Sequence, residues 1–189
     1  MAYEKYTTPA LVLGAREYGD ADRVFVLFTR DFGLVRARAS SARRESSRLR
    51  YGLATFARSS VSLVKGKRGW RLVGSSALVC PPLAYADAEM FSRITSLLLR
   101  LVHGEDRNDY LFETLVNARE TLGSDAVRAY TELLCVTRML YALGYISKEG
   151  LTEALFAHAL YTETDMQTVR AARIDMAARV NGALTATNL

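Results

Sequence analysis

Positive charge gathers in one stretch of this sequence, from Arg36 to Arg71. The stretch holds 11 Lys and Arg residues and a single acid, Glu45. An exposed surface normally mixes charges of both signs, because cations within about one Debye length, roughly 8–10 Å, repel one another. A polyphosphate relieves that repulsion, and the release of its counterions drives binding. The stretch therefore predicts a nucleic-acid surface, with an anionic membrane or an acidic protein as alternatives.

The spacing of the first charges shows how they are presented. Three apolar residues, Val35, Ala37 and Ala39, alternate with Arg36 and Arg38, which is the period of a β-strand. We expect the apolar set to face a core and both arginines to lie on the outer surface.

The candidate DNA-binding residues are cations of this strand, of the segment after it and of a later hairpin turn, with two aromatic residues. They are Arg36, Arg38, Arg43, Arg44, Arg48, Arg50, Tyr51, Lys65, Lys67, Arg68 and Trp70. Tyr51 and Trp70 are suited to stack on bases, or alternatively belong to the core, where we expect Phe56. No segment resembles a device for reading base edges, so we expect binding independent of base sequence.

Residues that would indicate catalysis are missing from the sequence. It contains no G-x-S-x-G, Walker A, H-E-x-x-H or G-x-G-x-x-G motif. Asp20 and Asp22 follow Gly19 and are expected to form a turn rather than a carboxylate pair. The cysteines, Cys80 and Cys135, are too far apart for a C-x-x-C metal pair. We expect a protein that is not an enzyme and that has no cofactor and no metal.

Charge divides the chain into two halves. Residues 1–80 carry 15 basic and 6 acidic residues, a net charge of +9, whereas residues 81–189 carry 10 and 14, a net charge of −4. The change falls at Cys80-Pro81-Pro82, where two prolines end any strand. We therefore predict a nucleic-acid-binding domain at 1–80 and a helical, partner-binding domain at 81–189. Short apolar runs and the absence of a signal-peptide pattern predict a cytoplasmic protein without a membrane span. With nucleic acid as its expected partner, we expect it to be nucleoid-associated and to have no membrane partner.

Five strands are predicted in the first half. They cover Thr8–Arg16, Arg23–Thr29, the strand after Gly33, Thr55–Val64 and Trp70–Val79. Five short strands with a long connection after the third fit a Greek-key barrel of the OB type.

Helical periodicity begins after Pro82. The expected helices cover Asp87–His103, the residues after Asn108 to Leu122, Ser124 to Gly144, a shorter one at Leu151–Tyr161, and a last one ending near Leu184. A capping box at Thr164-x-x-Gln167 is expected to start the last helix. The predicted fold class is α+β, with an N-terminal barrel and a C-terminal helical bundle.

The order of these pieces resembles the bacterial recombination mediator RecO. ALVLGAREYG, then D-x-x-FVLFTRDFG, then the basic stretch at Arg36–Arg44 are similar to the opening of that family. Residues Tyr130–Leu134 and Thr137–Tyr145 resemble a degenerate form of its F-E-L-R-L-L-x-x-L-G-Y phrase. Many members place a four-cysteine zinc site soon after that phrase, whereas this chain has Ile146–Leu151 without cysteine, which implies a zinc-free form.

The resemblance implies a function. A RecO-like protein would bind single- and double-stranded DNA, anneal complementary strands and help replace single-strand-binding protein with recombinase. Its implied partners are RecR and the acidic C-terminal tail of single-strand-binding protein, held by the helical domain. Arg138 is our candidate for holding that tail, with an intramolecular ion pair as the alternative.

Two other functions remain open from the sequence. One is an OB-fold RNA-binding protein, which would share the barrel and the charge. The other is a non-catalytic adaptor whose basic face meets an acidic protein. A nuclease would need metal-binding carboxylates, which the sequence does not offer in a recognisable pattern.

Overall fold

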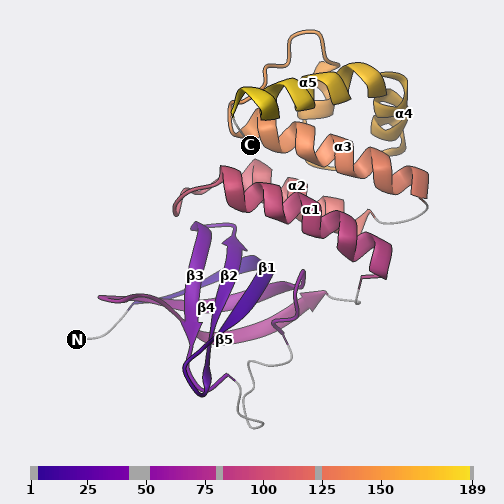
Figure 1. Ribbon diagram of the computed structural model, residues 1–189. Helices are drawn as coiled ribbons and strands as arrows, with labels where there is room; N and C mark the ends of the chain where they lie inside the picture. Colours follow the sequence, from indigo (N-terminus) through magenta and orange to yellow (C-terminus); the bar gives the residue numbers. More distant parts are fainter. Residues whose placement is uncertain (1–3, 43–51, 80–82, 122–124, 188–189) are drawn as a thin grey trace. The chain divides into compact units, whose positions relative to one another are not determined.

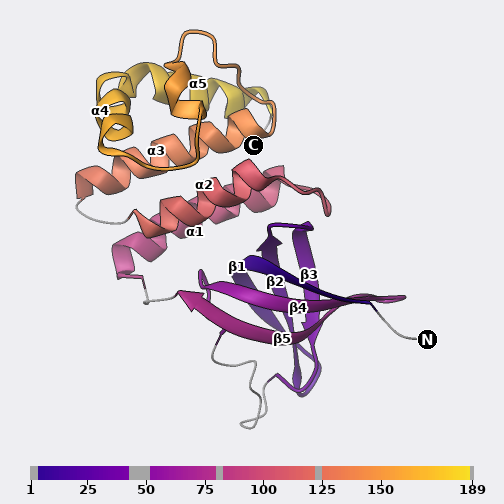
Figure 2. The same ribbon diagram turned by 180° about the vertical axis from the view of Figure 1, so that it is seen from behind.

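The computed structural model describes residues 4–42, 52–79, 83–121 and 125–187. They form two compact units, one of residues 1–83 with 103–108, the other of residues 84–102 with 109–189, each within the described ranges. The first unit is built of strands and the second of helices (Figures 1 and 2). The short segment 103–108 belongs to the strand unit although it follows the first helix in the sequence.

Five strands close into a barrel in the first unit. They are β1 (Lys5–Tyr18), β2 (Asp22–Thr29), β3 (Gly33–Ala39), β4 (Arg58–Gly66) and β5 (Gly69–Val79). The closed order is β1-β2-β3-β5-β4, with β1 antiparallel to both β2 and β4 and with β3 parallel to β5. The predicted OB-type barrel followed by a helical region is confirmed. The β4–β5 hairpin extends beyond the remainder of the barrel in both ribbon views (Figures 1 and 2).

The β2–β3 turn depends on a glycine. Gly33 has a positive φ of 58°, and an added Cβ would collide with the backbone of Asp106. Segment 103–108 therefore packs closely on this turn of the barrel, and a side chain at position 33 would push it away.

Alternation along the strands fills the barrel core. Its apolar residues include Val12, Leu27, Val61, Leu63 and Leu72, which are at most 3% exposed. The 14-residue strand β1 shifts register between Val12 and Gly14, a β-bulge that lets a long strand follow the curvature of the barrel.

The helical unit contains five α-helices within the described residues. They are α1 (Tyr85–Leu101), α2 (Asp109–Glu120), α3 (Asp125–Ala142), α4 (Glu163–Ala171) and α5 (Arg173–Ala186), with a 3-10 turn, η2 (Glu153–Phe156). Leu134 of α3 packs with Leu155, Phe156, Val169 and Met176 in a buried cluster. No helix of the described residues combines the length and apolar character that a membrane span requires.

Two predictions about the C-terminal elements are wrong. Leu151–Tyr161 holds only the single turn η2, and the Leu155 carbonyl, which in a longer helix would accept from the Ala159 amide, accepts instead from the Arg138 side chain of α3. The predicted last helix is two helices that meet at Ala172.

The capping box also lies two residues earlier than predicted. Thr162 accepts a hydrogen bond from the Asp165 amide at 3.1 Å, and the Asp165 carboxylate accepts one from the Thr162 amide at 2.9 Å. Aspartate in the third helical position fills the role that the sequence pattern assigned to Gln167.

Candidate nucleic-acid interface

The arginines of strand β3 lie on its outer face, as the alternation of apolar and basic residues predicted. Val35, Ala37 and Ala39 are buried and Arg36 and Arg38 are exposed, which confirms the two faces of this strand. The exposed face continues onto β5, where Arg71 pairs with Arg38 in the parallel register.

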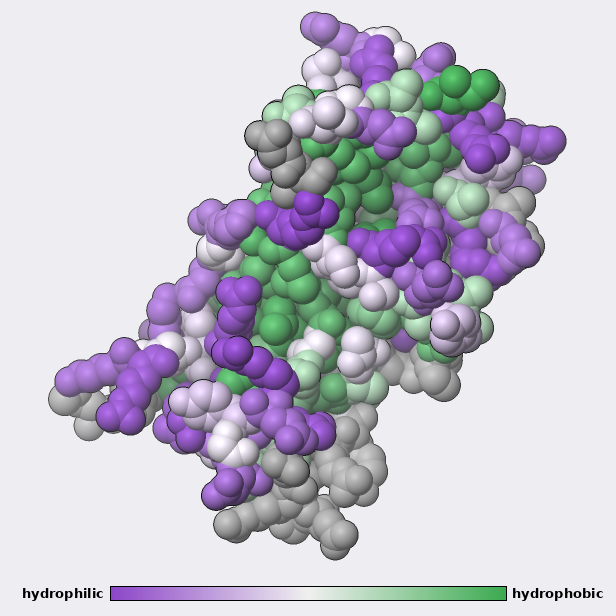
Figure 3. All heavy atoms as spheres, viewed as in Figure 1, coloured by the Kyte–Doolittle hydropathy of each residue, from purple (hydrophilic) through white to green (hydrophobic). Residues whose placement is uncertain are grey.

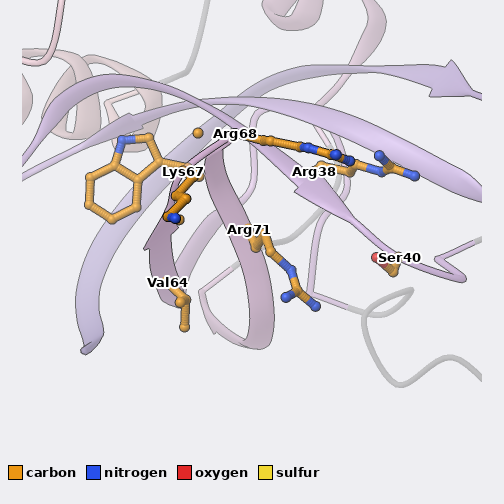
Figure 4. A pocket seen from close by; sticks show the side chains of 9 residues that line it. Arg38, Ser40, Val64, Lys67, Arg68 and Arg71 are labelled. Carbon is orange, nitrogen blue, oxygen red and sulfur yellow. The ribbon is translucent and has the colours of Figure 1, made fainter. Parts of the chain in front are cut away.

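A basic groove of about 500 Å³ lies where β3 meets the β4–β5 hairpin. Its lining comes from β3 and the residue after it, from the hairpin turn and from the adjacent ends of β4 and β5. The residues are Arg38, Ser40, Val64, Gly66, Lys67, Arg68, Gly69, Trp70 and Arg71. Figure 4 shows the four cationic side chains around the groove, and hydrophilic residues gather on the projecting strand pair at the lower left of Figure 3. A groove with four cations can hold a chain of phosphates.

The hairpin turn places two of these cations. Gly66 pairs with Gly69, which leaves Lys67 and Arg68 as a two-residue turn, and Gly69 takes a positive φ of 99°. Such a tight turn exposes both of its central side chains, and Lys67 and Arg68 are indeed exposed.

Arg38 is held by an acid of the same unit. Its Nε lies 2.7 Å and its Nη2 2.6 Å from Asp22 Oδ2, and its guanidinium lies 4.6 Å from the centre of the Tyr18 ring. The Ser41 amide donates to the other oxygen of Asp22 at 2.8 Å. These hydrogen bonds, that of Ser41 first, lower the pKa of Asp22. Asp22 is therefore more than the turn former that the sequence predicted.

Lys65 is held by a second acid, Glu105 of segment 103–108. Lys65 Nζ lies 2.7 Å from Glu105 Oε2, and Trp70 Nε1 donates to Glu105 Oε1 at 2.8 Å. The hydrogen bond from Lys65, followed by that from Trp70, lowers the pKa of Glu105 against the opposing effect of burial. No local pattern in the sequence pointed to Glu105, which lies 40 residues from Lys65 in the chain.

Four cations of the groove and of the adjoining β3 face have no counterion among the described residues. Among the described residues, no carboxylate lies within ion-pair distance of Arg36, Lys67, Arg68 or Arg71. Arg71 was not among the predicted site residues, although its position one residue after an inward-facing Trp70 would have placed it on the outer surface. These four side chains, three of which line the groove, are available to an external anion.

Trp70 lies in the core, one of the two alternatives that the sequence left open. It is 6% exposed and packs with Phe32 and Tyr6, with ring centres 5.1 Å and 5.8 Å away. Five other candidates lie outside the described residues. These are Arg43, Arg44, Arg48, Arg50 and Tyr51.

Arg138 forms intramolecular interactions, the second of the two roles predicted for it from the sequence. Its side chain is 0% exposed, and it donates to Leu155 O at 2.7 Å and to Leu160 O at 2.6 Å. Asp165 lies 3.6 Å from its Nη2, and the Tyr161 ring centre lies 4.9 Å from its guanidinium. In this structure an acidic peptide has no access to the Arg138 side chain.

An apolar groove of about 380 Å³ lies within the helical unit, between α1, α3 and α5. Ile94, Leu133 and Val180 are among the residues lining it, and Arg93 and Arg173 contribute cations. Arg93 is paired with Glu132 at 2.7 Å, whereas no carboxylate of the described residues lies within ion-pair distance of Arg173. Hydrophobic residues show between hydrophilic ones on this unit in Figure 3.

Metal-ligating side chains do not cluster in the described part of the chain. No group of three or more His, Cys, Asp or Glu residues there is arranged to hold a metal ion. Cys135 is fully buried, and this burial raises the pKa of its thiol to about 12.

Comparison with known proteins supports the resemblance seen in the sequence. Residues 1–79 match the family described as Recombination protein O N terminal. The chain is 34% identical over 151 residues to the DNA repair protein RecO of Heliobacterium modesticaldum, covering 77% of this chain and 54% of that protein. It is 32% identical over 146 residues to the DNA repair protein RecO of Chlorobium limicola, covering 73% and 55%.

These matches confirm the resemblance to the RecO family that the sequence analysis identified. A shorter match, 42% identical over 62 residues, joins 33% of the chain to 23% of the DNA repair protein RecO of Desulfitobacterium hafniense. The chain spans about half the length of the two relatives that match most of it.

Proposed function

Because this chain belongs to the RecO family through residues 1–79 and resembles RecO proteins over most of its length, we propose that it is a non-catalytic mediator of DNA repair and recombination. It binds single- and double-stranded DNA through the backbone phosphates, anneals complementary strands and helps recombinase replace single-strand-binding protein. RecR and single-strand-binding protein are its partners. The division into a DNA-binding domain at 1–80 and a partner-binding domain at 81–189 is part of the same proposal.

The observation that carries this proposal is a group of cations on one part of the barrel that have no counterion among the described residues. Arg36, Lys67, Arg68 and Arg71 are all exposed, and the last three line one groove. Each phosphate contact made by a cation releases condensed counterions, so binding is sequence-independent and sensitive to salt. The same charges screen the repulsion between two phosphate backbones, which is what annealing requires.

The apolar groove of the helical unit suits the acidic tail of single-strand-binding protein better than Arg138 does. Arg173 offers an exposed cation beside apolar residues, a combination that fits a peptide carrying both carboxylates and apolar side chains. We place the tail there, with Arg173→Glu expected to weaken the binding of a tail peptide and leave DNA affinity unchanged.

A salt titration tests the DNA-binding part of the proposal. Replacing Lys67, Arg68 and Arg71 by Ala removes up to three phosphate contacts, so the log–log salt slope for a labelled single strand falls by roughly 2, at about 0.7 per contact. The matched control removes three exposed cations of the helical unit, Arg100, Arg170 and Arg173, and leaves the slope unchanged. Equal effects of the two triple variants would contradict an interface on the barrel.

The mediator part needs a second measurement. The wild-type protein is expected to accelerate annealing of complementary strands coated with single-strand-binding protein, and the barrel triple variant is expected to lose this activity. A strong preference for RNA over DNA of equal length would instead favour an RNA-binding function.

A further inference from the structure

The Glu105 carboxylate lies in a small anion site on the barrel. Its two oxygens are bound by one cation, the ammonium of Lys65, and by one neutral donor, the indole N–H of Trp70. The ammonium also lies 5.1 Å from the centre of the Trp70 ring. The side chains of Lys65 and Glu105 are 57% and 41% exposed, so another anion can reach them from solution.

The donors of this site suit a phosphate as well as a carboxylate. A phosphodiester presents two anionic oxygens and can accept a charge-assisted hydrogen bond from an ammonium together with one from a neutral N–H. Lys65 and Trp70 are paired across β4 and β5, on either side of the turn that carries Lys67 and Arg68. By strand alternation this pair lies on the opposite face of the hairpin from Val64 and Arg71, which line the basic groove. A nucleic-acid backbone that crosses the exposed turn at Lys67 and Arg68 can reach both faces.

We propose that the place of the Glu105 carboxylate is a phosphate subsite of the nucleic-acid interface, and that Glu105 is its internal competitor. A backbone phosphodiester displaces the carboxylate and takes over its bonds to Lys65 and Trp70. This inference rests on the proposed nucleic-acid binding and adds a fifth cation and a regulatory acid to it.

The exchange is feasible because the ion pair that it breaks is weak. A solvent-exposed ion pair contributes about 0.2–1 kcal/mol, and the incoming phosphate makes an equivalent pair while releasing its counterions. The Trp70 N–H keeps an acceptor throughout, so no buried donor is left without one.

Displacement also frees the segment that carries Glu105. Residues 103–108 join α1 to α2 in the sequence, and Asp106 approaches Gly33 of the barrel. Bound nucleic acid is therefore expected to increase amide hydrogen exchange in residues 103–108 of the full chain. The increase would occur directly between α1 and α2 in the sequence.

The test uses the only tryptophan of the chain, Trp70, as a reporter within the subsite. Oligo(dT) binding is followed by anisotropy of a label on the DNA and, in parallel, by Trp70 emission. In the wild type both signals are expected to change with the same midpoint. Glu105→Gln keeps an acceptor for the indole but removes the competing charge. At about 0.1 M salt, affinity is expected to rise about 5-fold, while the salt slope stays the same because both proteins neutralise the same number of phosphates.

Two variants control for unspecific charge effects. Asp106→Asn removes the same charge from the neighbouring residue and is expected to change affinity less than about 2-fold. In the Lys65→Gln background, Glu105→Gln is expected to give no gain, because the cation that it would release is missing.

Each outcome separates this inference from the proposed function. DNA binding seen by anisotropy without a change in Trp70 emission, or with equal gains from Glu105→Gln and Asp106→Asn, overturns the subsite and leaves the proposed function standing. Failure of the wild type to bind any nucleic acid overturns both.

Discussion

Arg38 and Arg71 lie directly opposite each other where β3 and β5 pair in parallel. Like charges that face each other across neighbouring strands destabilise a sheet. Asp22 compensates Arg38 at 2.6 Å, whereas no carboxylate of the described residues lies within ion-pair distance of Arg71. The barrel therefore carries at Arg71 a charge that its own stability does not require.

Arg71→Ala is accordingly expected to separate stability from binding. Removing the repulsion leaves the free energy of unfolding unchanged or raises it by up to about 0.5 kcal/mol, while the salt slope for single strands falls by about 0.7. Urea unfolding and a salt titration on the same variant measure the two effects. Arg38→Ala is the matched comparison, since it leaves Asp22 without its partner and is expected to lower stability. Destabilisation above about 1 kcal/mol in Arg71→Ala would assign Arg71 a structural role instead.

The faces of the barrel could be predicted because a strand's alternation is local. Val35 and Arg36 point to opposite sides whatever the remainder of the chain does, and both were placed correctly. The environment of Trp70 could not be settled in this way, because its core position depends on Tyr6 and Phe32, which are distant in the sequence.

Long-range interactions account for what the sequence did not predict. Glu105 forms an ion pair with Lys65, which lies 40 residues away in the sequence. No periodic pattern around either residue predicts this contact. The helix expected at Leu151–Tyr161 is wrong for a related reason, since the Leu155 carbonyl accepts a hydrogen bond from Arg138 of α3 instead of from the helix backbone. Tertiary hydrogen bonds there override a local helical pattern.

The basic strand and the segment after it are expected to act together on the phosphate backbone. Replacing Arg36, Arg38, Arg43 and Arg44 by Ala lowers the salt slope for single strands by up to about 0.7 for each phosphate that is no longer neutralised, roughly 3 in all. Affinity falls alike for every base sequence, because interactions with the backbone carry no base information. Salt titration measures the slope and circular dichroism checks folding. A folded variant with an unchanged slope would place the nucleic acid along Lys65–Arg71 alone.

The Lys65–Glu105 pair is expected to make stability depend on acid pH. Lys65 lowers the pKa of Glu105 below its ordinary value of 4.5, so the stabilisation is present above pH 4.5 and is lost as the pH falls through the lower, folded-state pKa. At neutral pH the wild type is expected to exceed Glu105→Gln by about 0.2–1 kcal/mol in free energy of unfolding. Urea unfolding across the acid range is expected to show that difference disappear, and a difference independent of pH would contradict the ion pair.

Arg138 is expected to make the largest contribution to the stability of the irregular segment between α3 and α4. It donates to Leu155 and Leu160 and lies 3.6 Å from Asp165, so Arg138→Met leaves two carbonyl groups and a buried carboxylate without their cation. Removing one member of a buried charged cluster costs about 3–5 kcal/mol, whereas Arg170→Met, at an exposed position of α4, is expected to cost less than about 0.5 kcal/mol.

Urea unfolding gives the overall decrease in stability for both variants, and hydrogen exchange locates it. Amides of residues 151–161 are expected to exchange faster in Arg138→Met, while those of the barrel strands keep their wild-type protection, because the partners of this side chain among the described residues all lie in the helical unit. A decrease in the free energy of unfolding of less than about 1 kcal/mol, or faster exchange spread evenly over both units, would show that apolar packing rather than Arg138 stabilises the segment.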